Sequence, residues 1–271
     1  MTMTDTGGDA GSKVTTHEHI PAAQRVVVKV GSSSVTGANV AQIDTLIDAL
    51  AAAHQRGSEV ILVSSGAIAS ALSVLKLDSR PSDLATQQAA AAVGQNVLMW
   101  RYQTSLDRHE IIAGQILLTA GDMENPTHRS NARRAIERLL GLRALPIVNE
   151  NDTVATQEIR FGDNDRLAAL VSVLVRADVL ILLSDIDALY TRPPKEAGAV
   201  RIDHVPHDDD LREVAFGDIG EAGVGTGGAS TKVAAAKYAA EHGIPTLLAE
   251  TAKVADALSG AKIGTWFAAK P

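Results

Sequence analysis

The chain has 271 residues, of which 45% are hydrophobic, 21% charged and only 3% aromatic, and its formal net charge is −7. This composition is typical of a globular protein that can bury a sizeable core, while the acidic balance and the few aromatic residues argue against a general nucleic-acid binder. Because the chain has no cysteine, disulfides, thiolate nucleophiles and cysteine-ligated zinc are excluded.

The first 22 residues are polar and lack an apolar central stretch, so we expect residues 1–22 to be a disordered leader and not a signal peptide. No apolar run approaches the ~20 residues that a membrane-spanning helix needs. We therefore expect a cytoplasmic protein without a membrane partner, in which residues 23–271 form one domain.

Beyond the leader, short apolar runs alternate with alanine-rich stretches. The predicted strands are residues 25–30, 59–63, 111–118, 144–148, 178–183, 244–248 and 265–268. The predicted helices are residues 43–55, 83–108, 130–140, 166–176 and 230–242. Because the strands are apolar almost throughout, they are typical of a parallel sheet that is covered on both faces. The alternation predicts a doubly wound α/β fold.

Small polar loops follow the strand ends, where open α/β sheets bind their ligands. Two of these loops contain a lysine, Lys29 and Lys232. Glycines allow backbone amides to approach an anion, and a following helix start adds positive potential. No G-x-G-x-x-G follows the first predicted strand, which argues against a dinucleotide-binding domain, and the 225–232 loop is not a Walker A sequence because its lysine follows the Ser-Thr pair. The alternative to a functional role for Lys29 is a lysine at the strand end whose side chain extends to solvent.

Five loops can be read together along the chain. They are Val-Lys29-Val-Gly-Ser-Ser, Val-Ser-Ser65-Gly-Ala-Ile, Val-Asn-Glu-Asn-Asp152, Phe-Gly-Asp-Asn164-Asp165 and Gly-Thr-Gly-Gly-Ala-Ser-Thr-Lys232. Each loop alone is weakly specific, whereas five in this order are strongly so. By this pattern, residues 25–268 resemble the glutamate 5-kinases of the amino acid kinase family. The resemblance implies an α/β fold, a three-layer αβα sandwich with a mostly parallel central sheet.

The resemblance also implies a reaction, the ATP-dependent phosphorylation of the side-chain carboxylate of L-glutamate to L-glutamyl 5-phosphate, the first step of proline biosynthesis. A carboxylate with a pKa near ~4 is already ionised at neutral pH and needs no general base. What the reaction needs is in-line positioning and neutralisation of charge on the phosphoryl oxygens. By resemblance, Lys29 and Lys232 supply that positive charge and Asp165 holds them in place.

Glutamate would bind Ser65, Asp152 and Asn164, which match the glutamate positions of the family. Asp152 suits an α-ammonium group, whereas Ser65 and Asn164 can hydrogen-bond either end of the amino acid. These residues could instead be ordinary turn formers. The implied ATP contacts are Lys29, Gly31, Gly66, Ser184, Asp185, Thr226, Gly227, Gly228, Ala229, Ser230, Thr231 and Lys232.

Other implications concern ligands and assembly. We expect Mg²⁺ to bind mainly through the phosphate oxygens of ATP, and we assign no protein metal ligands. Proline is the expected feedback inhibitor, and a homodimer or homotetramer is the expected assembly. Many bacterial relatives carry a C-terminal PUA domain where this sequence ends, so we expect a naturally short or a truncated form. The family usually has methionine at the position of Ala229 and glycine at that of Ala188.

Two alternatives remain. The chain could be another kinase of the same fold, acting on acetylglutamate, aspartate, carbamate or a nucleoside monophosphate. It could also be a sensor that binds a nucleotide or an amino acid without turnover. The Asn149–Asp152 and Gly162–Asp165 loops argue against the first alternative, and the intact Lys29, Lys232 and Asp165 argue against the second.

Overall fold

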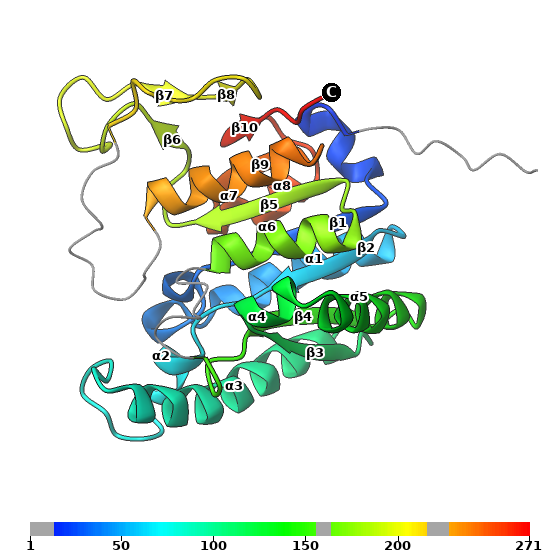
Figure 1. The fold of residues 1–271 in the computed structure, drawn as a ribbon, viewed down its shortest axis with the longest axis vertical. Helices are drawn as coiled ribbons and strands as arrows, with labels where there is room; N and C mark the ends of the chain where they lie inside the picture. Colours follow the sequence, from blue (N-terminus) through cyan, green and yellow to red (C-terminus); the bar gives the residue numbers. More distant parts are fainter. Residues whose placement is uncertain (1–13, 156–163, 216–227) are drawn as a thin grey trace, which may run out of the picture.

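A single eight-stranded sheet forms the centre of the protein, with helices on both of its faces (Figure 1). The computed structural model describes residues 14–155, 164–215 and 228–271. In spatial order the strands of this sheet are β3 (Ala113–Leu118), β4 (Leu145–Glu150), β2 (Glu59–Val63), β1 (Arg25–Lys29), β5 (Val179–Ser184), β9 (Thr246–Glu250), β10 (Thr265–Phe267) and β8 (His204–Val205). A second, antiparallel sheet joins β6 (Leu189–Tyr190) and β7 (Arg201–Ile202).

The first six strands of this order are all parallel, and among the described strands of this sheet only β10 and β9 pair antiparallel. The α-helices are α1 (Gln42–Gln55), α2 (Ala67–Ala71), α3 (Leu84–Asp107), α4 (Ala120–Glu124), α5 (Pro126–Gly141), α6 (Asn164–Val175), α7 (Ala229–Glu241) and α8 (Val254–Leu258). The 3-10 helices are η1 (His17–Ala22), η2 (Ser32–Ser34), η3 (Gly37–Asn39) and η4 (Thr251–Lys253). This architecture confirms the predicted α/β sandwich with a mostly parallel sheet.

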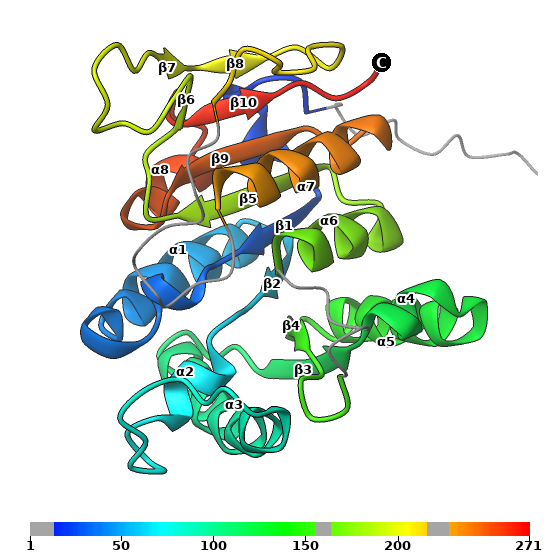
Figure 2. The ribbon, with the colours of Figure 1, turned by 60° about the vertical axis from the view of Figure 1, so that its left-hand side comes forward.

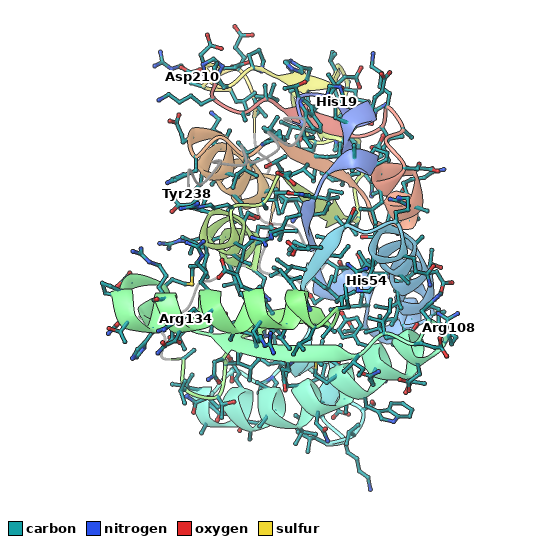
Figure 3. The ribbon with its side chains drawn as sticks, turned by 90° about the vertical axis from the view of Figure 1, so that its right-hand side faces the viewer. His19, His54, Arg108, Arg134, Asp210 and Tyr238 are labelled. Carbon is teal, nitrogen blue, oxygen red and sulfur yellow. The ribbon has the colours of Figure 1, made fainter. Side chains whose placement is uncertain are left out.

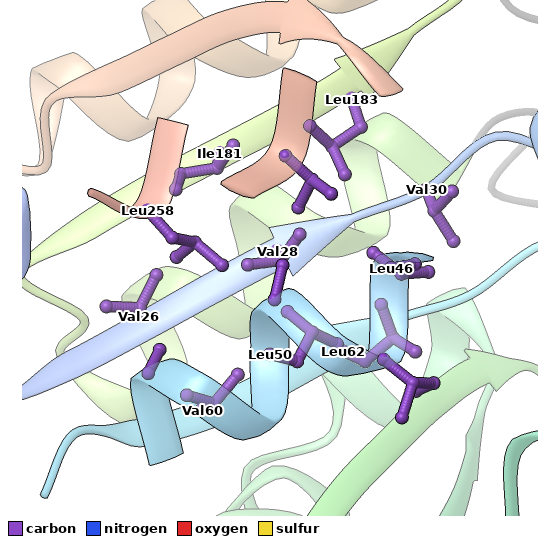
Figure 4. Packing of buried hydrophobic residues seen from close by; sticks show 14 of the residues in the cluster. Val26, Val28, Val30, Leu46, Leu50, Val60, Leu62, Ile181, Leu183 and Leu258 are labelled. Atoms are coloured by element: carbon purple, nitrogen blue, oxygen red, sulfur yellow. The ribbon is translucent and has the colours of Figure 1, made fainter. Parts of the chain in front are cut away.

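The two faces of the sheet have separate apolar cores, and β1 contributes to both. Val26 and Val28 pack with Leu50 of α1 and Leu258 of α8 (Figure 4). Val27 points to the other face, whose core is built from α5, α6 and α7. Figure 2 shows α1 and α8 on one side of the sheet and α5 and α6 on the other. Burial on both faces explains why the strand sequences are apolar without alternation.

Surface ion pairs join the end of α3 to α1. Arg108, just beyond α3, lies 3.3 Å from Asp44 and 2.8 Å from Asp48 of α1 (Figure 3). All three side chains are partly exposed, so these pairs add little stability. Over the part of the chain that the structure describes, no helix combines the length and the apolarity needed to cross a membrane.

The N-terminal segment differs from the expected leader. Val14 and Ile20 are buried in the first core, and Ile20 belongs to η1, which precedes β1. His17 Nε2 lies 2.9 Å from the carbonyl oxygen of Ile263, and its ring lies 5.0 Å from that of Trp266. The prediction of disorder over residues 1–22 is therefore wrong for residues 14–22, because the side chains of Val14 and Ile20 anchor this segment in the core. Residues 1–13 lie outside the described ranges.

Candidate active site

The strand order brings four of the polar loops together. β4, β2, β1 and β5 are neighbours and parallel, so their carboxyl ends lie at one edge of the sheet. In this register Lys29 is opposite Val63 of β2 and Leu182 of β5. The residues that follow β2 therefore lie at about the same level as the last residue of β1 and the end of β5. This edge is where an open α/β sheet binds its ligand.

A buried charge centre lies at this edge. Lys29 Nζ is 2.5 Å from Asp165 Oδ1, and Lys232 Nζ is 3.0 Å from Asp165 Oδ2. Their side chains are 4%, 8% and 0% exposed in the order Lys29, Lys232, Asp165. Burial of this extent rules out a Lys29 that extends to solvent. Because two cations share one anion, the three side chains carry a net positive charge in a region from which water is largely excluded.

Two packed helices bring the charges together. Asp165 is the second residue of α6, where a negative charge interacts favourably with the helix dipole. Lys232 lies in the first turn of α7, where a cation is unfavourable unless an anion offsets it. α6 packs against α7, and Thr231 Oγ1 adds a 3.3 Å hydrogen bond to Asp165 Oδ2. The pairing with Asp165 therefore accounts for a lysine at a helix start.

The loop after β2 approaches the loop after β1 closely. Gly66, just before α2, has φ +93°, in the left-handed region that favours glycine. A Cβ atom there would lie 2.9 Å from Thr36 Cγ2 and 3.2 Å from Ser32 Cβ. Gly31, by contrast, has room, since a Cβ would lie 3.9 Å from Lys29 Nζ. Gly66 is thus required both by its backbone conformation and by the close approach of the two loops.

The three residues expected to bind glutamate lie in neighbouring loops. Ser65 follows β2, Asp152 follows β4, and both are half-buried. Asn164 is the first residue of α6, and its Nδ2 donates to the carbonyl oxygen of Ser64 at 2.7 Å and to Asn149 Oδ1 at 2.9 Å. The structure places Asn164 beside the charge centre, because it precedes Asp165.

Sequence reasoning missed several polar residues that support these loops. Asn149 and Ser64 are almost fully buried and hold Asn164, while Gln95 and Tyr102 of α3 hold Asn149 and Ser64 in turn. Burial raises the pKa of Tyr102 to about 12, against a hydrogen bond with Ser64 that lowers it, so its hydroxyl stays protonated. One signal was present in the sequence. Asn149 is a polar residue of the Asn-Glu-Asn-Asp loop that directly follows an apolar run, which indicates a supporting role for its side chain.

The residues expected on the nucleotide side fall in two places. Ser184 ends β5 and is buried, and its Oγ donates to Oδ1 of the exposed Asp185 at 3.0 Å. Gly228 caps α7 without a side-chain hydrogen bond, although Thr231 Oγ1 donates to its carbonyl at 2.9 Å. Ala229 and Ser230 begin α7. Thr226 and Gly227 lie outside the described residues.

A cavity of about 310 Å³ opens beside Ser184 and Asp185, at the ends of β1, β5 and β9. Its other lining residues are Ser33, Ser34, Asn39, Gln42, Glu250, Thr251 and Ala252. This lining is polar, with hydroxyl, amide and carboxylate groups. Across residues 14–155, 164–215 and 228–271, no group of three or more His, Asp or Glu side chains is arranged to hold a metal ion.

The comparisons with known sequences agree on one family. Residues 24–250 match the Amino acid kinase family. A glutamate 5-kinase of Leifsonia xyli subsp. xyli is 68% identical over 249 residues, which are 92% of each chain. A glutamate 5-kinase of Salinispora arenicola is 53% identical over 258 residues, 94% of this chain and 70% of that protein.

The fold also matches a solved structure, the carbamate kinase from Giardia lamblia bound to AMP-PNP. The TM-score is 0.67 over 92% of this chain and 100% of that one, with 16% sequence identity, so this likeness concerns the fold. The family match covers most of the chain and agrees with the relatives at 68% identity and with the fold. This chain belongs to the amino acid kinase family.

Proposed function

We propose that this chain transfers the γ-phosphoryl group of ATP to the side-chain carboxylate of L-glutamate, forming L-glutamyl 5-phosphate for proline biosynthesis. The observation that carries the proposal is the buried centre of Lys29, Asp165 and Lys232 at the strand ends, next to Asn164. The relatives named glutamate 5-kinase support glutamate as the acceptor.

The positive charge of this centre suits the reaction, in which a negatively charged phosphoryl group moves from one anion, the nucleotide, to another, the substrate carboxylate. In the proposed reaction an oxygen of the substrate carboxylate attacks the γ-phosphorus, the bond to the β-phosphate oxygen breaks, and ADP leaves. No proton has to be removed, because the carboxylate is already ionised. Lys29 and Lys232 would stabilise charge on the transferring phosphoryl oxygens, and Asp165 would keep their ammonium groups apart and oriented.

The nucleotide requires groups that tolerate phosphate. The capping position of α7 has no side-chain cap, so backbone amides of that first turn can serve a phosphate together with Lys232. We assign Gly31, Gly66, Ser184, Asp185 and residues 226–232 to the ATP site. Mg²⁺ would enter with the phosphates and offset part of their charge, since it retains several waters and needs few protein ligands.

Asp152, Ser65 and Asn164 would hold the amino acid. Proline, which lacks a side-chain carboxylate, would inhibit by occupying the same pocket without accepting a phosphoryl group. We also propose a homodimer or homotetramer as the assembly and the cytoplasm as the compartment, in line with the family resemblance.

A coupled assay of ADP release tests the reaction. L-glutamate is compared with N-acetylglutamate, aspartate, carbamate and a nucleoside monophosphate at equal concentrations, with ATP and Mg²⁺. The proposal expects the highest kcat/KM with L-glutamate. Faster turnover with another acceptor would assign the chain to a different substrate, and ligand binding without any ADP release would identify a sensor. Proline should raise the apparent KM for glutamate without lowering kcat.

A further inference from the structure

We propose that Gln95 of α3 is a positioning residue for the amino acid site and acts through Asn149 on the side-chain amide of Asn164. The inference rests on the proposed function, because it takes Asn164 as a glutamate contact. Gln95 belongs to none of the five loops at the strand ends, and in the described parts of the chain its side chain is hydrogen-bonded to one of them through Asn149.

The three amides are linked by hydrogen bonds that are buried at Gln95 and Asn149 and partly buried at Asn164. Asn149 Nδ2 donates to Gln95 Oε1 at 2.8 Å, and Asn164 Nδ2 donates to Asn149 Oδ1 at 2.9 Å. Asn149 is 1% exposed and Gln95 is 8% exposed. Exchange with water is therefore restricted at Asn149 and Gln95, and each amide depends on the next one for a hydrogen-bond partner.

Two backbone groups fix the direction of the hydrogen bonds between these amides. The backbone N–H of Glu150 donates to Asn149 Oδ1 at 2.9 Å, so Asn149 must turn its Nδ2 toward Gln95. The carbonyl of Ser64 accepts from Asn164 Nδ2 at 2.7 Å, so this nitrogen uses both hydrogens within the protein. A backbone N–H can only donate and a carbonyl can only accept, which leaves no second orientation for either amide.

Asn164 consequently offers an acceptor to a ligand. Its Oδ1 is buried and has no hydrogen-bond partner among the described residues. A buried acceptor without a partner is costly, so a donor from a ligand would relieve it. Of the charged groups of an amino acid, the α-ammonium donates and the carboxylates do not. This selects the ammonium group as the part of glutamate that meets Asn164.

Close helix packing lets α3 perform this role. A Cβ atom on Gly94 would lie 1.7 Å from the carbonyl oxygen of Ala67, so α3 and the start of α2 meet backbone to backbone beside Gln95. Two turns along α3, the hydroxyl of Tyr102 lies 2.9 Å from Ser64 Oγ. α3 therefore supports both acceptors of the Asn164 amide, Asn149 through Gln95 and Ser64 through Tyr102.

Gln95→Met tests the inference, because it keeps the length of the side chain and removes the accepting oxygen. We expect the KM for L-glutamate to rise about tenfold, which corresponds to about 1.4 kcal/mol, while kcat and the KM for ATP change less than twofold. The matched control is Gln103→Met on the same helix, which removes hydrogen bonds to the backbone of Ala113 and Ile111, away from the site. It should lower thermal stability and leave the KM for glutamate unchanged.

The conservative variant should restore the lost function. Gln95 Nε2 has no partner in the described parts of the chain, so Gln95→Glu retains the oxygen that accepts from Asn149 and should keep the KM for glutamate within threefold of wild type. If Gln95→Met fails to fold, Gln95→Ala is measured with the same expectation. A KM for glutamate within twofold of wild type, or an equal rise in Gln103→Met, overturns the inference. Wild-type protein that does not phosphorylate glutamate overturns the proposed function instead.

Discussion

Lys29 and Lys232, which lie near opposite ends of the chain, contact different oxygens of one carboxylate, that of Asp165. The shared carboxylate offsets the repulsion between the two ammonium groups in this buried site. Among these three side chains there is one more positive charge than negative, which suits the approach of a phosphoryl group.

Lys232→Ala should reduce phosphoryl transfer by at least about 10²–10³-fold, the usual effect of removing one group that stabilises the transition state. Glutamate binding should survive, because Ser65, Asp152 and Asn164 are unchanged. ADP release measures the first quantity and calorimetric titration with glutamate the second. Lys253→Ala, at an exposed lysine paired with Asp256, is the control and should retain full turnover. Near wild-type turnover of Lys232→Ala would refute its assigned role.

Asp165→Asn should destabilise the fold as well as abolish activity. The substitution removes the carboxylate that two buried ammonium groups contact, and breaking a buried ion pair from one side costs about 3–5 kcal/mol. Urea unfolding monitored by circular dichroism gives the free energy of unfolding. Asp256→Asn breaks an exposed pair with Lys253 and should cost at most about 1 kcal/mol. Equal losses in the two variants would contradict a special role for the buried centre.

The strands were the most predictable part of the fold. Residues 59–63 were predicted and observed with the same bounds, because a β-branched apolar run stands between Gly57-Ser58 and Ser64. α5 begins at Pro126, four residues before the predicted start. The side chain of Asn125 accepts hydrogen bonds from the backbone N–H groups of Thr127 and His128, so its Asn-Pro start was readable from the rules of helix capping.

Other features depend on contacts between distant segments. α2 and α4 have five residues each, too few to show a helical period, and tertiary packing stabilises such short helices. The residues of the charge centre were expected from the family resemblance, whereas their convergence follows from the position of β1 between β2 and β5. Gln95 was missed because nothing local distinguishes it from the other glutamines of α3. Only the fold brings it to Asn149.

Gly94→Ala should destabilise the contact between α3 and α2. A methyl group 1.7 Å from the carbonyl oxygen of Ala67 forces the helices apart, and overpacking of this kind costs about 1–3 kcal/mol. Because Gln95 is the next residue, we also expect a higher KM for glutamate. Gly141→Ala, at an exposed helix end with no atom near the added Cβ, should be neutral or stabilising by up to about 1 kcal/mol. Unfolding curves of the two variants that shift alike would contradict the close contact.

His54 should make stability depend on pH. Burial, together with the nearby positive charge of Arg143, lowers the pKa of His54 below its ordinary value of 6.5, although a hydrogen bond to the Arg143 carbonyl opposes this. His54 Nε2 lies 3.0 Å from that carbonyl, while Nδ1 lies 3.2 Å from the Arg143 guanidinium. Nε2 must then donate and Nδ1 must accept, which only the neutral ring can do.

The sign of the effect follows from proton binding. Between the lowered pKa and 6.5 the unfolded chain binds more protons than the folded one, so the stability from neutral His54 is complete above 6.5 and is lost as the pH falls below it. His54→Gln keeps one donor and one acceptor and should flatten the dependence of the unfolding free energy on pH below 6.5. The exposed His207→Gln should retain the wild-type slope, as His54 is intact. An unchanged slope in His54→Gln would mean that other groups, such as His17, whose pKa burial also lowers, dominate the titration.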